Sequence, residues 1–202
     1  MAKKRFRTHA NPLNFREEVS ALDLHDICAE GQSLDFEIGF GRGVFMRHYA
    51  KHNPDRVIVG VEVRKPVALD VQKLIKEESV TNAHAYYGEG KLFLEQALPD
   101  QCLEKVFIFH PDPWFKKKHY KRRVVNEALL SLLIQRMKPK GRIYVSTDVA
   151  ALWEDISEHF KNETDFKEIE EAPFWTKYYK THWSLFSEKD ERSCHCGTWE
   201  KS

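Results

Sequence analysis

Residues 34–43 read Leu34-Asp35-Phe36-Glu37-Ile38-Gly39-Phe40-Gly41-Arg42-Gly43, and this stretch decides the fold class. Its first half is strand-like, and three alternating glycines then interrupt regular structure before a segment of helical character, residues 44–51. Glycine lets the chain turn tightly and lets a ligand approach the backbone closely. A strand, a glycine-rich turn and a helix in this order are typical of a ligand-binding α/β unit.

The alternation of strand and helix continues along the chain. Strands are predicted at 34–38, 56–61, 83–87, 105–109 and 142–146, and helices at 44–51, 65–78, 91–98, 126–137 and 149–160. This order predicts an α/β fold of the Rossmann-like kind, with a mostly parallel central sheet and helices on both faces. Residues 1–16 are polar and basic and are expected to form a flexible arm ahead of a single domain over 17–202.

The composition limits the class of protein further. A chain of 202 residues, 42% hydrophobic and 31% charged, is expected to be a soluble domain that buries a core without metal or disulfides. The net charge of +1 excludes a uniformly basic protein but leaves room for a local basic surface. No apolar run approaches the ~20 residues that span a bilayer, and none follows the basic N-terminus as in a signal peptide. The four scattered cysteines predict a reduced, cytoplasmic protein.

Three acidic residues stand at the ends of predicted strands, where parallel sheets bind ligands. Glu37 precedes a G-x-G-x-G turn, which departs from the dinucleotide pattern G-x-G-x-x-G and suits a cationic part of a ligand. Glu62 can accept both hydroxyls of a ribose, and Glu89 can accept a hydrogen bond from an adenine amino group. The structural alternatives are a ligand-free glycine turn, a solvated Glu62 and a Glu89 that caps the next helix.

Residues 110–123 are the most unusual stretch of the chain. Asp112 stands between Pro111 and Pro113, and an aromatic pair then leads into seven basic or histidine residues in eight positions, 116–123. Phosphate-rich ligands require such a cluster of charge, and a neighbouring aromatic ring can stack on an exposed base. A charge run is often only a solvated face, but this one follows a strand and a stiff acidic turn. It therefore favours contact with nucleic acid.

Two other features carry weaker signals. Asp148 follows the last predicted strand, and the local sequence favours its use as the N-cap of the next helix over a place in the same cleft as Asp112. Cys194-His195-Cys196 does not have the usual spacing of a zinc site, and no second pair faces it. No metal is expected.

Taken together, these motifs resemble the bacterial tRNA (guanine-N7)-methyltransferases, a branch of the class I S-adenosylmethionine-dependent enzymes. The resemblance covers about residues 34–160. The acidic and glycine-rich motif at 37–43 is shared by many methyltransferases, whereas Pro111-Asp112-Pro113-Trp114 with its basic run is far more specific. Thr147-Asp148 and residues 7–12 are also similar to segments of the family. The resemblance implies a class I methyltransferase fold and methyl transfer from S-adenosylmethionine to N7 of a guanine in tRNA, in the variable loop.

The resemblance also implies roles for particular residues. Asp112 is expected where the donor methyl group and the guanine meet. Cofactor contacts are expected at Glu37, Gly39, Gly41, Gly43, Glu62 and Glu89, where the family usually has Asp at the last position. Substrate contacts are expected at Lys116, Asp148, Thr181 and Trp183. Contacts to tRNA phosphates are expected at Lys117, Lys118, Lys121, Arg122 and Arg123.

One departure keeps alternatives open. The family usually carries Thr-x-(Phe/Tyr)-Glu near the C-terminus, whereas this chain has Thr181-His182-Trp183-Ser184. A class I methyltransferase with another substrate, a catalytically degenerate tRNA-binding protein and a nicotinamide oxidoreductase are the alternatives. A monomer or a homodimer is expected, and a partner subunit is not excluded.

Overall fold

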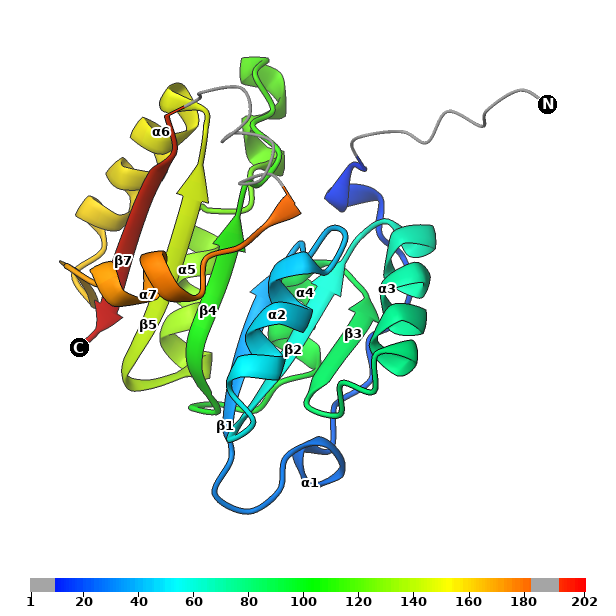
Figure 1. Ribbon diagram of the computed structural model, residues 1–202. Coiled ribbons are helices and arrows are strands. Elements are labelled where there is room, and N and C mark those ends of the chain that lie inside the picture. Colours follow the sequence, from blue (N-terminus) through cyan, green and yellow to red (C-terminus); the bar gives the residue numbers. More distant parts are fainter. Residues whose placement is uncertain (1–9, 183–192) are drawn as a thin grey trace.

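The computed structural model describes residues 10–182 and 193–202 and shows a three-layer α/β architecture (Figure 1). Within these residues, seven strands form one sheet in the order β3-β2-β1-β4-β5-β7-β6. The neighbours from β3 to β5 are parallel, whereas β7 runs antiparallel to both β5 and β6. The predicted mostly parallel sheet is confirmed. The strand order reverses between β1 and β4, which is where such sheets bind ligands beyond their carboxyl ends.

The strands and helices alternate as the sequence predicts through α6. The strands are β1 Ser33–Ile38, β2 Arg56–Glu62, β3 Ala83–Tyr87, β4 Leu103–Phe109, β5 Met137–Thr147, β6 Phe166–Ile169 and β7 His195–Lys201. The α-helices are α1 Leu24–Ile27, α2 Val44–His52, α3 Lys65–Glu77, α4 Gly90–Gln96, α5 Glu127–Arg136, α6 Ala150–Asn162 and α7 Ala172–Lys177. Two 3-10 helices, η1 Pro12–Asn14 and η2 Lys117–Arg122, complete the described elements.

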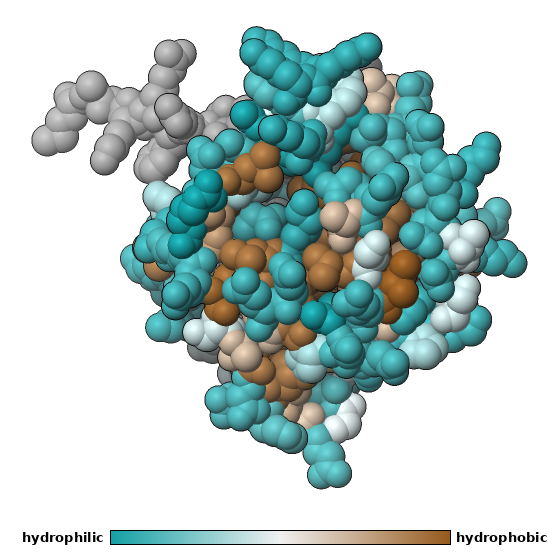
Figure 2. Space-filling view, turned by 180° about the vertical axis from the view of Figure 1, so that it is seen from behind, coloured by the Kyte–Doolittle hydropathy of each residue, from teal (hydrophilic) through white to brown (hydrophobic). Residues whose placement is uncertain are grey.

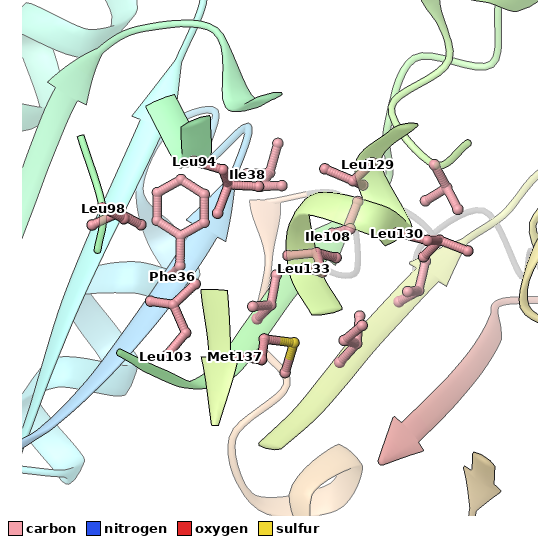
Figure 3. Packing of buried hydrophobic residues seen from close by; sticks show 14 of the residues in the cluster. Phe36, Ile38, Leu94, Leu98, Leu103, Ile108, Leu129, Leu130, Leu133 and Met137 are labelled. Carbon is pink, nitrogen blue, oxygen red and sulfur yellow. The ribbon is translucent and has the colours of Figure 1, made fainter. Parts of the chain in front are cut away.

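Each face of the sheet has its own hydrophobic core. On one face, side chains of β1 and β4 such as Phe36 and Ile108 pack against α4 and α5 (Figure 3). On the other face, α2, α3 and α7 cover the sheet, and the rings of Phe107 and Phe174 stack 5.5 Å apart. The strands between these helical layers are buried on both sides, which explains their nearly continuous apolar sequences. Among the described residues, no helix is long and apolar enough to cross a membrane.

The amino end of the sheet holds a buried ion pair that is separate from the ligand-binding end. Asp35 is fully buried in β1 and accepts hydrogen bonds from Arg56 Nε at 2.7 Å and Tyr49 Oη at 2.9 Å. A buried carboxylate is tolerated when charged and polar donors surround it in this way. We therefore infer that Asp35, Arg56 and Tyr49 stabilise the fold and do not bind a ligand.

Three local predictions can be compared with the structure. Residues 139–141 were expected to form a turn before the fifth strand; β5 instead begins at Met137, and its pairing with β4 shifts register across these residues, with Lys140 at a left-handed φ of 65°. Residues 1–9 of the expected arm lie outside the described residues, and the rest of that segment contains η1 and the Phe15 ring, which packs edge-on against Tyr87. The N-cap of α6 is Val149 rather than Asp148, and Thr147 Oγ1 accepts the Val149 N–H at 3.2 Å.

Candidate active site

The glycine-rich turn lies between β1 and α2, at the carboxyl end of the sheet (Figure 1). Gly39, Gly41 and Gly43 have φ values of 77°, 53° and 64°, a backbone region that side chains rarely permit. A Cβ atom at Gly39 would meet no atom within 4 Å, whereas one at Gly43 would lie 2.5 Å from Val71 Cγ1. Gly39 therefore leaves open space beside the turn, and Gly43 permits the close packing of α3.

Glu37 lies directly beneath this turn as a buried carboxyl group. Its side chain is almost fully buried, and its Oε2 atom has no hydrogen-bond partner. Burial, together with the nearby charge of Glu62, raises the pKa of Glu37 to about 8. A buried acceptor without a donor is costly, so this atom is suited to receive a donor from a bound ligand.

Glu62 ends β2 beside the turn and is held in place on two sides. Its Oε2 accepts the Gly41 N–H at 3.1 Å, and the guanidinium of Arg64 reaches both carboxylate oxygens at 2.9 and 2.8 Å. Arg64 is not among the site residues predicted from the sequence. Its position two residues after Glu62, at the start of α3, is the signal that could have found it.

Glu89 takes the helix-capping alternative in this structure. Its Oε2 accepts the Leu92 N–H at 2.9 Å at the start of α4. It also lines a cavity of about 200 Å³ together with η1 residues, Phe15 and part of the basic run. A residue that caps a helix can still face a ligand with its other oxygen, so both expectations for Glu89 stand.

Asp112 lies in the turn that leaves β4, on the same side as Glu62. The turn is tightly shaped, because His110 and Trp114 both adopt left-handed backbone conformations, at φ 47° and 43°. The hydrogen bonds that Arg64 donates to Glu62 are the main cause that raises the pKa of this guanidinium, and the charge of Asp112 raises it further. Arg64 therefore holds the proposed cofactor carboxylate, Glu62, and lies within electrostatic reach of the proposed catalytic carboxylate, Asp112.

The basic run forms η2, which projects from the carboxyl end of the sheet (Figure 1). Figure 2 shows hydrophilic side chains over that projecting end. Lys116, Lys117, Lys118 and Lys121 are exposed. Arg122 lies 4.8 Å above the ring of Trp114, which ties the helix to the Asp112 turn. These four lysine side chains are therefore accessible to a phosphate-rich ligand.

Arg123 is placed differently from the exposed lysines. It is only 6% exposed, donates from Nε to the Pro113 carbonyl at 3.0 Å and forms an ion pair with Asp155 at 3.0 Å. Its guanidinium also lies 3.6 Å from the ring centroid of Tyr120. Sequence cannot separate a solvated arginine from one that folds inward to hold its own loop, and the expected phosphate contact of Arg123 stays a prediction.

Replacement Arg123→Gln is therefore expected to affect stability first. It leaves the Asp155 carboxylate and the Pro113 carbonyl without their donor, which we expect to cost about 2–3 kcal/mol of unfolding free energy. Denaturant titration measures this loss, with the exposed Lys118→Gln as the matched control, expected to change stability by less than ~0.5 kcal/mol. Unchanged stability combined with a weaker salt dependence of RNA binding would show that Arg123 contacts phosphate after all.

A second group of polar residues lies on the far side of the Asp112 turn. The His110 ring is buried, with Nδ1 3.5 Å from Asp148 and Nε2 2.7 Å from Tyr179 Oη. Thr181 is buried. Burial, followed by the charge of Arg42 in the glycine turn, lowers the pKa of His182. Trp183 lies outside the described residues.

These residues fit a nucleoside ligand that carries a positive charge. The unpartnered Glu37 oxygen suits a cationic group, and the glycine turn leaves open space. Glu62 at the end of β2 and Glu89 just after β3 offer two further carboxylates. The chain has the fold of the class I S-adenosylmethionine-dependent methyltransferases. It is similar in fold to the aminoglycoside-resistance methyltransferase NpmB1 (TM-score 0.61, 16% identity, covering 89% of this chain and 92% of that chain). The 16S rRNA methyltransferase KamB is also similar (TM-score 0.60, 14% identity, covering 92% and 95%).

The comparisons with known sequences define the family more closely. A family model described as "Putative methyltransferase" matches residues 32–199. The tRNA (guanine-N(7)-)-methyltransferase of Synechococcus elongatus is 32% identical over 173 residues, which cover 83% of this chain and 81% of the relative. That of Idiomarina loihiensis is 36% identical over 142 residues, 70% of this chain and 56% of the relative. The chain belongs to the tRNA (guanine-N7)-methyltransferase family.

Proposed function

We propose that this enzyme transfers the methyl group of S-adenosylmethionine to N7 of a guanine in the variable loop of tRNA. One observation carries the proposal: the Asp112 turn joins the acidic, glycine-lined ligand site to an exposed basic helix. In this proposal the nucleoside cofactor binds on the glycine side of Asp112 and the phosphate-rich substrate on the side of the basic helix. The enzyme is expected to act in the cytoplasm as a monomer or homodimer.

The residues act by positioning rather than by acid–base chemistry. When bound, S-adenosylmethionine supplies a methyl group on a positively charged sulfur that is already electrophilic. Guanine N7 carries a free lone pair, so the protein needs neither a general base nor a covalent nucleophile. Glu37, Glu62 and Glu89 hold the cofactor, and Asp112 orients the guanine edge and stabilises the positive charge that develops on the purine.

Cofactor affinity is expected to rise with pH because of Glu37. With its pKa raised to about 8, this carboxyl group is mostly protonated in the free protein at pH 6–7. A cationic ligand favours the ionised form, so removing protons strengthens binding, while the ligand's own amine stays protonated below its pKa of about 8. We expect S-adenosylhomocysteine to bind about tenfold more tightly at pH 7 than at pH 6, as measured by titration calorimetry.

The matched control is Glu37→Gln, which keeps the shape of the side chain and removes its titration. This variant is expected to bind S-adenosylhomocysteine more weakly than the wild type at pH 7. Its affinity should not show the tenfold rise between pH 6 and pH 7. A wild-type affinity that stays constant from pH 6 to pH 7 would contradict the role of Glu37 as the acceptor of a cationic group.

The proposed acceptor atom can be tested by removing it from the substrate. An unmodified tRNA transcript is compared with one that contains 7-deazaguanosine in place of guanosine, which keeps base pairing but has carbon at position 7. Labelled methyl groups from S-adenosylmethionine are expected in the first transcript and not in the second. Equal labelling of both transcripts would exclude N7 as the methyl acceptor. If neither transcript is labelled although the cofactor binds, the substrate is not tRNA.

A further inference from the structure

A pair of thiols lies beside the active site without a role in the proposed chemistry. Cys194 directly precedes β7 and Cys196 lies within it, so an extended chain places both side chains on the same face. Both are free and exposed, and their sulfur atoms are 3.6 Å apart. Among the described residues, no group of three or more histidine, cysteine or acidic side chains is arranged to hold a metal ion. The pair is therefore considered as a dithiol.

The dithiol lies against Tyr179, which also contacts the turn that carries Asp112. Cys194 Sγ lies 3.5 Å from Tyr179 Oη, and the same hydroxyl lies 2.7 Å from His110 Nε2 and donates to Ser146 Oγ at 2.8 Å. Cys196 stands opposite Ser146 in the pairing of β7 with β5. His110 is held at a left-handed φ of 47° two residues before Asp112. A movement of Cys194 therefore acts on contacts that fix the shape of this turn.

The geometry permits the two thiols to join. Residues two apart on a strand have Cα atoms roughly 6.6–6.8 Å apart, at the upper end of the range for disulfides, so closure requires only a small local shift. The two sulfurs must approach from 3.6 Å to the S–S bond length of about 2.05 Å.

The electrostatic surroundings make Cys194 the reactive partner. The hydrogen bond from Cys196, followed by interactions with His110 and Tyr179, lowers the pKa of the Cys194 thiol, although burial opposes this shift. Burial instead raises the pKa of Cys28, and it raises that of Cys102 to about 11. The thiolate is the form that reacts with oxidants, so Cys194 is expected to react before the other two.

We propose that Cys194 and Cys196 form an oxidation-sensitive site that hydroperoxides close into a disulfide, and that closure slows methyl transfer. In the first step the Cys194 thiolate attacks a peroxide oxygen, the O–O bond breaks, and a sulfenic acid and hydroxide form. In the second step Cys196 attacks Cys194 Sγ, the S–O bond breaks, and water leaves with the Cys196 proton. The two thiols lose two electrons in total, and hydrogen peroxide becomes two waters.

The effect on activity, which rests on the proposed function, follows from the Tyr179 contact. Closure draws Cys194 toward Cys196 and away from Tyr179, so Tyr179 and then His110 lose a partner that fixes the Asp112 turn. We expect the kcat/KM of the oxidised enzyme for tRNA to fall at least fivefold and to recover fully after treatment with dithiothreitol.

Peptide mass spectrometry tests the thiol chemistry independently of activity. The full-length protein is reduced, treated with hydrogen peroxide, alkylated and digested with trypsin, which releases Ser193–Lys201 with both cysteines. We expect this peptide to be 2 Da lighter than its reduced form and to resist alkylation, while Cys28 and Cys102 remain thiols. Cys196→Ser should instead stop at a sulfenic acid that dimedone traps, and Cys28→Ser should form the disulfide as the wild type does.

The outcomes separate the two proposals. Peroxide-treated peptide that is alkylated as fully as the reduced peptide would overturn the dithiol site. A disulfide that forms without changing kcat/KM, or equal inactivation of the Cys196→Ser variant, would overturn its effect on the turn. Reduced enzyme that transfers no methyl group to tRNA would refute the proposed function, and the mass measurement would still decide whether the dithiol closes.

Discussion

Replacement of Asp112 by alanine is expected to lower kcat for methyl transfer about 1000-fold or more. The carboxylate lies between the cofactor side and the basic helix, beside Arg64, where the purine is expected to acquire positive charge. Loss of a preorganised charge at such a point costs about 4 kcal/mol of transition-state stabilisation. Single-turnover kinetics with saturating cofactor and tRNA measure this effect without interference from binding.

Two controls distinguish catalysis from folding. Asp112 is half-buried in a surface turn, so the alanine variant is expected to unfold within a few degrees of the wild type and to bind S-adenosylhomocysteine. Asp112→Asn keeps the shape and part of the hydrogen bonding but removes the charge. Its kcat should lie between those of the wild type and the alanine variant. Full activity of the alanine variant would exclude the assignment of Asp112.

Replacement of Lys117, Lys118 and Lys121 by glutamine is expected to weaken tRNA binding about 100-fold at physiological salt. These side chains are exposed on η2, and each phosphate contact that is lost removes about 0.7–0.9 from the slope of log affinity against log salt. The slope should therefore fall by about 2–3 in the triple variant, as measured by filter binding from 50 to 300 mM salt.

The matched control replaces three exposed lysines on other elements, Lys76, Lys161 and Lys167, by glutamine. This variant has the same net charge as the η2 variant, so it separates local contacts from the field of the whole protein. We expect it to keep a slope close to that of the wild type. Equal slopes in the two variants would show that η2 is not the tRNA-binding surface.

The parallel half of the fold was predictable from the sequence because each of its strands is a short apolar run with turn residues beside it. Strand β7 was not, because His195–Thr198 is polar and becomes a strand only by pairing with β5, about fifty residues away in the chain. At residues 139–141 β5 continues as one strand, but its pairing with β4 passes from Leu103–Met137 to Lys105–Arg142 with a shift of register, so the expected turn residues mark an irregularity inside the strand.

The candidate site was predictable where a residue's type and its place at a strand end act together, as for Glu37, Glu62 and Asp112. Their placement at one end of the sheet agrees with that expectation, although their roles stay predictions. Arg64 and Tyr179 were missed because their importance depends on which carboxylate or ring they meet in space. The burial of Arg123 was not predictable, because a basic run does not show which of its members folds inward.

Nucleoside analysis after the reaction tests the central claim most directly. Purified enzyme, labelled S-adenosylmethionine and tRNA that lacks N7-methylguanosine are incubated, and the tRNA is digested to nucleosides for mass spectrometry. The proposed function predicts a labelled N7-methylguanosine peak with the wild-type enzyme and none with the Asp112→Ala variant. Label in another nucleoside, or no label in tRNA despite measured cofactor binding, would contradict it.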